Sequence, residues 1–308
     1  MVKSSGVDST VKGIGYGKVI LCGEHFVVHG NPAIAAGISN NAAVWAEEAQ
    51  ANEISTDSRV VPEISNRAIT AILNAMGIKK KYKVFMESDL PTFGGLGSSA
   101  AFSVALVRYM SHLNKMNLND EQVNRFAYEG EKVFHGNPSG IDNAMATYGG
   151  VLMFTKGKSY SDNVIDRFKL GLPLHLVVGM TGKFGATAKM VAAVKEFKEE
   201  DEAEFSQLLD EARELCHNGK AALEKGKMDV FGQIMNQNQS LLSEIGVSIE
   251  DNDKINKAAL DAGALGAKLT GGGGGGCCIS LAKDEDHANQ IIESIKKAGY
   301  EAFYTTVR

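Results

Sequence analysis

Hydrophobic residues follow two periods along this chain, one typical of β-strands and the other typical of α-helices. Short apolar runs and alternating stretches predict strands at 18–22, 33–38, 42–46, 82–87, 151–154, 174–180, 277–281 and 300–307. Apolar positions three or four residues apart predict helices at 67–76, 99–115, 141–147 and 288–298, and a largely helical region at 185–262. A capping box, with Asn119 three residues before Gln122, opens a further helix. The sequence therefore predicts a mixture of helices and strands.

A polar connection interrupts this pattern near Gly171. It separates the strands predicted at 151–154 and 174–180, and domain boundaries commonly fall in such connections. A chain of 308 residues is also long for one small core. We therefore expect an N-terminal domain of residues 1–170 and a C-terminal domain of residues 171–308.

The composition is that of a folded protein whose partners are small molecules. Hydrophobic residues make up 44% of the chain, enough for a sizeable core. The net charge of −5 argues against a nucleic-acid or membrane-surface binder, because such proteins normally carry a basic face. The four cysteines lack the spacing of a zinc site or a disulfide framework, and no signal peptide or membrane span is evident. We therefore expect a cytoplasmic protein.

Glycine is the one residue type that stands out, with 34 copies that cluster at a few places. One cluster lies at 91–101, Pro-Thr-Phe-Gly-Gly-Leu-Gly-Ser-Ser-Ala-Ala, between a predicted strand and a predicted helix. Its glycines let the backbone turn sharply and approach a ligand. Ser98 and Ser99 lie where the helix would begin, among unpaired N–H groups at the positive end of the helix dipole. This stretch predicts a phosphate-binding loop.

Two other nucleotide motifs compete with this interpretation. Gly95, Gly97 and Ala100 fit the dinucleotide pattern of a Rossmann oxidoreductase, but that fold needs a second strand ending in an acidic residue about 20 positions later. Residues 117–122 occupy that place and look like the start of another helix. A P-loop is disfavoured because Val19 stands where Ser or Thr is required. A purely structural turn remains the simplest alternative.

A second glycine cluster, Gly271–Gly276, lies between an apparent helix and an apolar strand. It could be a flexible spacer, but a spacer is unusual at such a place inside a compact domain. Six consecutive glycines more readily allow the backbone to approach a ligand or the other glycine loop. We therefore expect this run to serve the functional site.

Several polar residues near these loops are ambiguous by themselves. Asp142 and Glu131 could be ordinary solvated acids, although glycines and a proline fix an irregular backbone just before Asp142. His25 and His29 could be satisfied loop histidines. Lys18 precedes an apolar strand and is either solvated or directed into a cleft. Composition alone leaves these alternatives open.

Four motifs together resemble the kinase superfamily of galactokinase, homoserine kinase, mevalonate kinase and phosphomevalonate kinase. They are residues 17–30, 91–101, 135–143 and 268–276, so the resemblance covers nearly the whole chain. Within the superfamily the mevalonate kinases are most similar, because a galactokinase would continue the first motif's Gly-Glu-His with Thr-Asp. The fourth motif departs slightly, since Gly272 replaces the usual Ala, and a smaller residue leaves the loop's approach open.

The resemblance implies an α+β fold with two domains, an N-terminal ribosomal-protein-S5-like domain and a C-terminal ferredoxin-like domain, with the active site in the cleft between them. It implies ATP as co-substrate, Mg²⁺ as cofactor and phosphorylation of the 5-hydroxyl of mevalonate in isoprenoid biosynthesis. A related kinase for phosphomevalonate or homoserine, or a non-catalytic nucleotide-binding member of the fold, are the alternatives. A homodimer would be ordinary for the family.

The resemblance also implies roles for individual residues. The ATP phosphates would lie on Gly94, Gly95, Leu96, Gly97, Ser98, Ser99 and Ala100. Ser99 and Glu131 would be ligands of Mg²⁺, a hard cation that accepts hydroxyl and carboxylate oxygens. Asp142 would take the proton of the substrate hydroxyl, and Lys18 would lower the pKa of that hydroxyl and neutralise charge during transfer. The residues implied to contact the substrate are Lys18, Glu24, His25, Asp142 and Thr187.

Overall fold

The computed structural model describes residues 11–55, 62–91, 95–183 and 187–307. The chain forms two compact units, each containing helices and strands. Unit 1 takes its described residues from 1–17, 40–92 and 97–149, and unit 2 takes its described residues from 18–39, 93–96 and 150–308. The mixture of helices and strands expected from the sequence is confirmed, whereas the division into residues 1–170 and 171–308 stays a prediction.

Unit 1 joins a group of helices to a small set of strands. Its helices are α1 (Pro62–Ala75), α2 (Ser98–Leu113), α3 (Asp120–His135) and α4 (Ile141–Tyr148). Its strands are β3 (Glu53–Ser55), β4 (Lys81–Ser88) and parts of β1 (Gly13–Cys22) and β2 (Pro32–Ala49). β4 pairs antiparallel with residues 42–49 of β2 and parallel with β3.

Helix α2 forms the centre of the unit 1 core. Nearly every residue from Ala100 to Ser111 is buried, and the helix packs against α1, α3 and α4. The predicted alternation on β4 places Tyr82 and Val84 in the same hydrophobic cluster. The predicted capping box is present at the start of α3, which fixes the beginning of that helix beside α2. The two helices thus form a rigid support for the residues at the start of α2.

Two glycines of β1 let this strand lie directly on α2. A Cβ at Gly13 would lie 2.0 Å from the carbonyl oxygen of Ala105, and a Cβ at Gly15 would lie 2.0 Å from that of Ala101. No side chain fits at such a distance from a helix backbone. The spacing of the glycines, two apart on one face of the strand, therefore sets how closely β1 and α2 pack.

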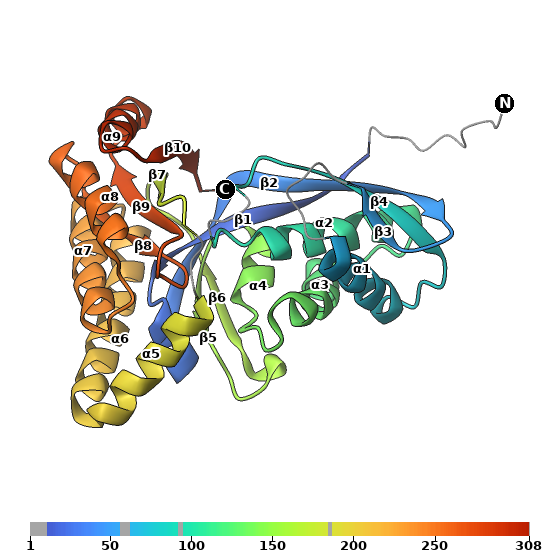
Figure 1. The fold of residues 1–308 in the computed structure, drawn as a ribbon, viewed down its shortest axis with the longest axis horizontal. Helices are drawn as coiled ribbons and strands as arrows, with labels where there is room; N and C mark the ends of the chain where they lie inside the picture. The colour runs from blue at the N-terminus through green and yellow to red at the C-terminus, as the bar shows by residue number, and fades with distance from the viewer. Residues whose placement is uncertain (1–10, 56–61, 92–94, 184–186, 308) are drawn as a thin grey trace. The chain divides into compact units, whose positions relative to one another are not determined.

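Unit 2 contains an antiparallel sheet with helices packed against it. The strand order is β10-β7-β9-β8, with β7 (His175–Met180), β8 (Gly266–Thr270), β9 (Cys277–Ala282) and β10 (Glu301–Thr306). The helices are α5 (Thr187–Glu200), α6 (Glu202–Glu224), α7 (Met228–Glu244), α8 (Glu250–Asp261) and α9 (Glu285–Lys297). α6 and α7 run side by side (Figure 1). The unit also contains the short helices η1 (His25–His29) and η2 (Tyr160–Asp162).

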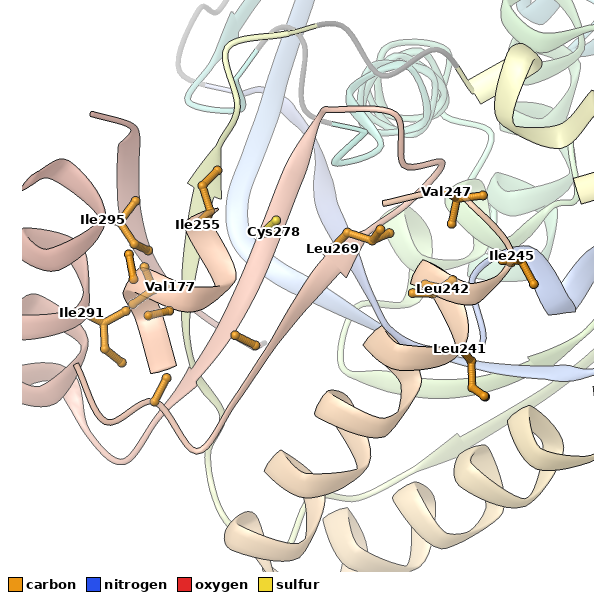
Figure 2. Packing of buried hydrophobic residues seen from close by; sticks show 14 of the residues in the cluster. Val177, Leu241, Leu242, Ile245, Val247, Ile255, Leu269, Cys278, Ile291 and Ile295 are labelled. Carbon is orange, nitrogen blue, oxygen red and sulfur yellow. The ribbon is translucent and has the colours of Figure 1, made fainter. Parts of the chain in front are cut away.

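One hydrophobic cluster joins the sheet of unit 2 to its helices (Figure 2). Leu269 of β8 and Cys278 of β9 lie on neighbouring strands, and Ile255 of α8 and Ile295 of α9 belong to the same cluster. Phe26 of η1 is fully buried in this cluster as well. The segment that follows β1 is therefore anchored in the unit 2 core.

Strand β2 differs from the sequence prediction. Residues 33–38 and 42–46 were expected to be separate strands, but they belong to one continuous strand from Pro32 to Ala49 (Figure 1). The polar residues between them stay extended because neighbouring groups satisfy them: the N–H of Asn41 donates to Asp89 and the Ser39 hydroxyl pairs with Thr305. A polar stretch inside a strand can therefore look like a turn in the sequence.

Three further strands were not predicted. β3 lies in a stretch for which no element was predicted, and β6 (Val164–Phe168) lies in the expected polar connection. β8 lies directly before the second glycine cluster, where an apparent helix was expected. β6 pairs with β5 (Val151–Thr155), which pairs in turn with residues 32–36 of β2 in unit 2. In the part of the chain that the structure describes, no helix combines the length and apolar character needed to cross a membrane.

Substitution of Gly15 tests the close packing of β1 on α2. We expect Gly15→Ala to lower the free energy of unfolding by about 1–3 kcal/mol or more, because the added methyl group forces the strand away from the helix. Urea denaturation measures the change. Gly77→Asn is the control, since a Cβ at Gly77 meets no described atom within 4 Å and Asn tolerates its φ of +73°. Equal losses in the two variants would contradict this account.

Candidate active site

The backbone of Lys18 connects β1 to the first glycine loop. Lys18 is 3% exposed, and its N–H donates a 2.8 Å hydrogen bond to the carbonyl oxygen of Leu96. The second glycine loop reaches the same place, because a Cβ at Gly271 would lie 3.5 Å from the carbonyl oxygen of Gly95. The expectation that the two glycine loops approach one another is confirmed within unit 2.

The second glycine loop also needs glycine for its own fold. Gly273 has a φ of +66°, and a Cβ there would lie 2.3 Å from the carbonyl oxygen of Val247. The N–H of Gly274 donates to that same carbonyl at 2.9 Å, which ties the loop to the segment before α8. The run of glycines is therefore a tightly packed loop and not a spacer.

His25 lies at the start of η1 and bonds to this loop. Its Nε2 lies 3.0 Å from the carbonyl oxygen of Gly272, and the residue is 5% exposed. Burial lowers the pKa of His25 below its usual 6.5, although the bond to Gly272 and the charge of Glu24 act in the opposite direction. A neutral imidazole carries one proton, and a carbonyl only accepts, so Nε2 holds the proton and Nδ1 is left as an acceptor.

Glu24 is held by a buried ion pair. Lys268 of β8 donates to its Oε1, and Nδ2 of Asn238 on α7 donates to its Oε2 at 3.1 Å. The side chains of Glu24 and Lys268 are both fully buried. Because the N–H of Gly23 donates to Oδ1 of Asn238 at 3.0 Å, the Asn238 amide can present only its NH₂ group to the carboxylate. Both carboxylate oxygens therefore have donors.

Two other contacts fix the end of β1 in the same region. The Thr270 hydroxyl accepts from the N–H of Ile20 at 2.8 Å and donates to the carbonyl oxygen of Ile20 at 3.1 Å. The Cys22 thiol donates to Asn238 at 3.1 Å and accepts from the Cys216 thiol at 3.3 Å. The bond from Cys216 and burial both raise the pKa of Cys22, so this thiol stays protonated and able to donate.

In unit 1, a hydroxyl and a carboxylate lie around one histidine nitrogen. Ser99 is in the first turn of α2, and its Oγ lies 3.0 Å from Nε2 of His135 at the end of α3. Oε2 of Glu131, one helical turn earlier, lies 3.8 Å from the same nitrogen. Gly130 permits this closeness, because a Cβ there would lie 2.5 Å from the Ser103 hydroxyl of α2.

Asp142 is the second residue of α4 and is half-buried. The amide of the next residue, Asn143, donates to Oδ1 of Asn124 at 2.6 Å and anchors α4 on α3. Gly140 precedes the helix with a φ of +93°, which a glycine adopts without strain. The aspartate is thus carried by a short helix whose position is fixed by a buried side-chain contact.

Comparisons with known proteins agree with this arrangement. The family model of the GHMP kinases N terminal domain matches residues 63–150, and the GHMP kinases C terminal model matches residues 220–301. The mevalonate kinase of Thermococcus sibiricus is 32% identical over 92% of this chain and 91% of its own length. That of Aeropyrum pernix is 33% identical over 94% of each chain.

A solved structure matches equally well. The crystal structure of L. major mevalonate kinase in complex with R-mevalonate has a TM-score of 0.90 and 34% identity, and the match covers 100% of this chain and 99% of the other. The chain belongs to the mevalonate kinases of the GHMP kinase family. Its α+β fold is therefore that of a kinase, and members of this family use ATP as co-substrate.

The residues that the family resemblance assigns to the active site fall into two groups. Lys18, Glu24 and His25 lie in unit 2 with Gly95 and Leu96. The members of the second group, in unit 1, are Gly97, Ser98, Ser99, Ala100, Glu131 and Asp142. Thr187 is the first residue of α5. Gly94 lies outside the described residues. The role of each of these residues stays a prediction.

Lys268, Asn238 and His135 were not predicted to be site residues. Lys268 carried a signal, because it stands between the apolar residues Ala267 and Leu269 and a buried lysine needs a partner. His135 carried one as well, since it lies four residues after Glu131 on the same helix face. Asn238 gave no signal, because an amide in an amphipathic helix is usually solvated.

The lowered pKa of His25 makes folding sensitive to acid. Below pH 6.5 the unfolded chain takes up a proton that folded His25 resists, so the free energy of unfolding falls as the pH decreases toward the folded-state pKa. The loss is at most about 1.4 kcal/mol per pH unit. Urea denaturation at pH 7.5 and 5.5 should show a smaller loss in His25→Gln, whose amide still donates to Gly272. Equal pH dependence in both proteins would contradict this assignment.

Proposed function

We propose that the chain transfers the γ-phosphoryl group of ATP to the 5-hydroxyl of mevalonate and yields 5-phosphomevalonate and ADP. The observation that carries this proposal is the match along the whole chain to a mevalonate kinase in complex with R-mevalonate. Lys18, Ser99, Glu131 and Asp142, to which the family resemblance assigns roles in the transfer, all lie on strands or helices that can hold them in place, which supports the proposal further. A non-catalytic member of the fold would have little reason to keep this set of residues.

The start of α2 supports a binding site for the ATP phosphates. Gly97 precedes the helix with a φ of +75° and has no side chain to cap it, which favours an anion as the partner of the first N–H groups of α2. The helix dipole favours negative charge at the same point, which allows phosphate binding without a P-loop lysine. The residues proposed for this site are Gly94, Gly95, Leu96, Gly97, Ser98, Ser99 and Ala100.

Ser99 and Glu131 would hold Mg²⁺. Their oxygens lie 3.0 Å and 3.8 Å from the same nitrogen, Nε2 of His135. A hydroxyl and a carboxylate suit a hard cation that keeps several waters and binds substrate phosphates. When bound, Mg²⁺ would supply positive charge that offsets the charge of the ATP phosphates.

Asp142 and Lys18 would carry out the transfer. The hydroxyl oxygen of mevalonate forms a bond to the γ-phosphorus while the bond from that phosphorus to the ADP oxygen breaks, and the hydroxyl proton passes to the Asp142 carboxylate. Lys18 lowers the pKa of the hydroxyl and balances negative charge during transfer. Both residues lie on elements fixed by hydrogen bonds, and positioning is the main requirement of this reaction.

The remaining substrate contacts would come from His25 and Thr187. The Nδ1 acceptor of neutral His25 suits a hydroxyl group of mevalonate, because a hydroxyl can donate to it. Glu24 completes the set implied by the family resemblance, although its carboxylate is already bonded to Lys268 and Asn238.

A panel of acceptors tests the proposed substrate. We expect kcat/KM for mevalonate to exceed that for phosphomevalonate, homoserine and galactose by about 100-fold or more, because unmatched polar groups are rejected strongly by a hydrogen-bonding site. A coupled assay of ADP release measures all four. A higher kcat/KM for another acceptor would identify that acceptor as the substrate in place of mevalonate. ATP binding without ADP release would indicate a non-catalytic protein.

Substitution of Asp142 tests the proton acceptor. We expect Asp142→Asn to lower kcat by about 10²–10⁴-fold, since general base catalysis contributes that range, while ATP binding is unchanged. Turnover comes from the coupled assay and ATP affinity from calorimetry. Asp286→Asn, an exposed acid in the first turn of α9, is the control and should be fully active. Near wild-type turnover in Asp142→Asn would rule out this role.

A further inference from the structure

Lys268 is a buried cation that the proposed phosphoryl transfer does not use. It lies in the middle of β8 with no exposed surface, bonded to Glu24 and to the carbonyl oxygen of Leu269 at 2.6 Å. A buried ammonium is strongly unfavourable unless it is paired and hydrogen-bonded. Lys268 is also the first residue of the motif at 268–276, three positions before the second glycine cluster, so its burial needs an explanation.

The strand that carries Lys268 is itself rigidly held. β8 is the last strand of its sheet, and α7 covers its outer edge. The N–H of Ala267 donates to Asn236 at 2.9 Å, and the N–H of Leu269 donates to Gln239 at 2.8 Å. Lys268 lies between these two anchored residues, so its ammonium is a fixed point in unit 2.

Glu24 is the residue that this fixed point holds. Its carboxylate has a donor on each oxygen, from Lys268 and Asn238, and its side chain has no exposed surface. This arrangement favours a positioning role for Glu24 over the direct substrate contact that the family resemblance implies. Fixing Glu24 also fixes the chain segment that contains it, which runs from Lys18 on β1 to His25 on η1.

We propose that Lys268 is a positioning residue for phosphoryl transfer: through Glu24 it holds the segment between Lys18 and His25 against β8 and the second glycine loop. The contact of His25 with Gly272 depends on this alignment, because Gly272 follows β8 by two residues. The two buried charges are tolerated because they balance one another. Removal of one partner therefore displaces the segment, whereas removal of both leaves it in place. This inference rests on the proposed function, since Lys18 and His25 serve the substrate there.

The test is a cycle of Lys268→Met, Glu24→Gln and the double variant, with kcat/KM for mevalonate and Kd for ATP as readouts. Each single variant leaves an unpaired buried charge and should lose kcat/KM by on the order of 10- to 100-fold, because small displacements are costly to catalysis. The Kd for ATP should change less than about threefold, because the displaced segment serves mevalonate in the proposed function. A general loss of structure would instead weaken the binding of both ligands. The double variant should recover at least about fivefold relative to either single variant, because it restores charge balance.

The opposite pattern overturns the proposal. If Glu24 contacts mevalonate directly, Glu24→Gln sets the loss and adding Lys268→Met recovers nothing. If Lys268 is merely structural, kcat/KM per folded molecule stays at the wild-type value in every variant. Should the single variants fail to fold, a double variant within about threefold of wild type supports the proposal, because misplacement is expected to cost on the order of 10- to 100-fold. A double variant that is unfolded or inactive overturns it, since the neutral pair must fit the same space.

A control pair and the wild-type protein separate this outcome from that of the proposed function. Lys257 and Asp261 form an exposed ion pair on α8, and Lys257→Met with Asp261→Asn should leave kcat/KM unchanged. If the wild-type protein phosphorylates a different acceptor, the proposed function fails while the same cycle, measured with that acceptor, still tests Lys268. If the wild-type protein phosphorylates mevalonate and the cycle shows no recovery, only the role of Lys268 fails.

Discussion

The buried ion pair between Glu24 and Lys268 is the constraint on which the geometry of unit 2 depends. Two charges taken out of water are tolerated only when each finds its partner and the remaining polar atoms are satisfied. Here Asn238 supplies the second donor to the carboxylate, and the carbonyl oxygen of Leu269 accepts from the ammonium. Any shift of β1 along β8 would separate the charges, so the pair selects one alignment of the strand end on the sheet.

Glycine acts in this protein at positions where backbone meets backbone. Gly15 admits α2, Gly273 admits the carbonyl oxygen of Val247, and Gly271 lies beside Gly95. At Gly15 and Gly273 the neighbouring carbonyl oxygen lies too close for a Cβ, so these glycines fix spacing as strictly as side chains do elsewhere. A Cβ at Gly271 would make an ordinary contact at 3.5 Å, and glycine is favoured there by its φ of +82°. The ion pair sets the alignment of the segments in unit 2, and the glycines set how closely they approach.

The sequence predicts the parts of this design that are local. The strand at 18–22, the helix after the first glycine loop and the capping box at Asn119 all depend on neighbouring residues, and each is present. The ion pair between Glu24 and Lys268 was not predictable, because 244 positions separate the two residues and the sequence around either one does not indicate its partner. The continuous strand β2 was missed for a similar reason, since the groups that satisfy its polar middle come from distant segments. The homodimer and the cytoplasmic location stay predictions.

The protonation of His25 follows from the same long-range packing. A carbonyl oxygen from the second glycine loop accepts from Nε2, and burial disfavours a second proton, so the imidazole is neutral with Nδ1 as an acceptor. A neutral imidazole adds no positive charge to the site, and its acceptor nitrogen can accept a hydrogen bond from a hydroxyl but cannot donate one to a carboxylate. The loop carbonyl thereby decides which groups of a small polar molecule this histidine can recognise, although neither its position nor its acceptor role is visible in the local sequence around His25.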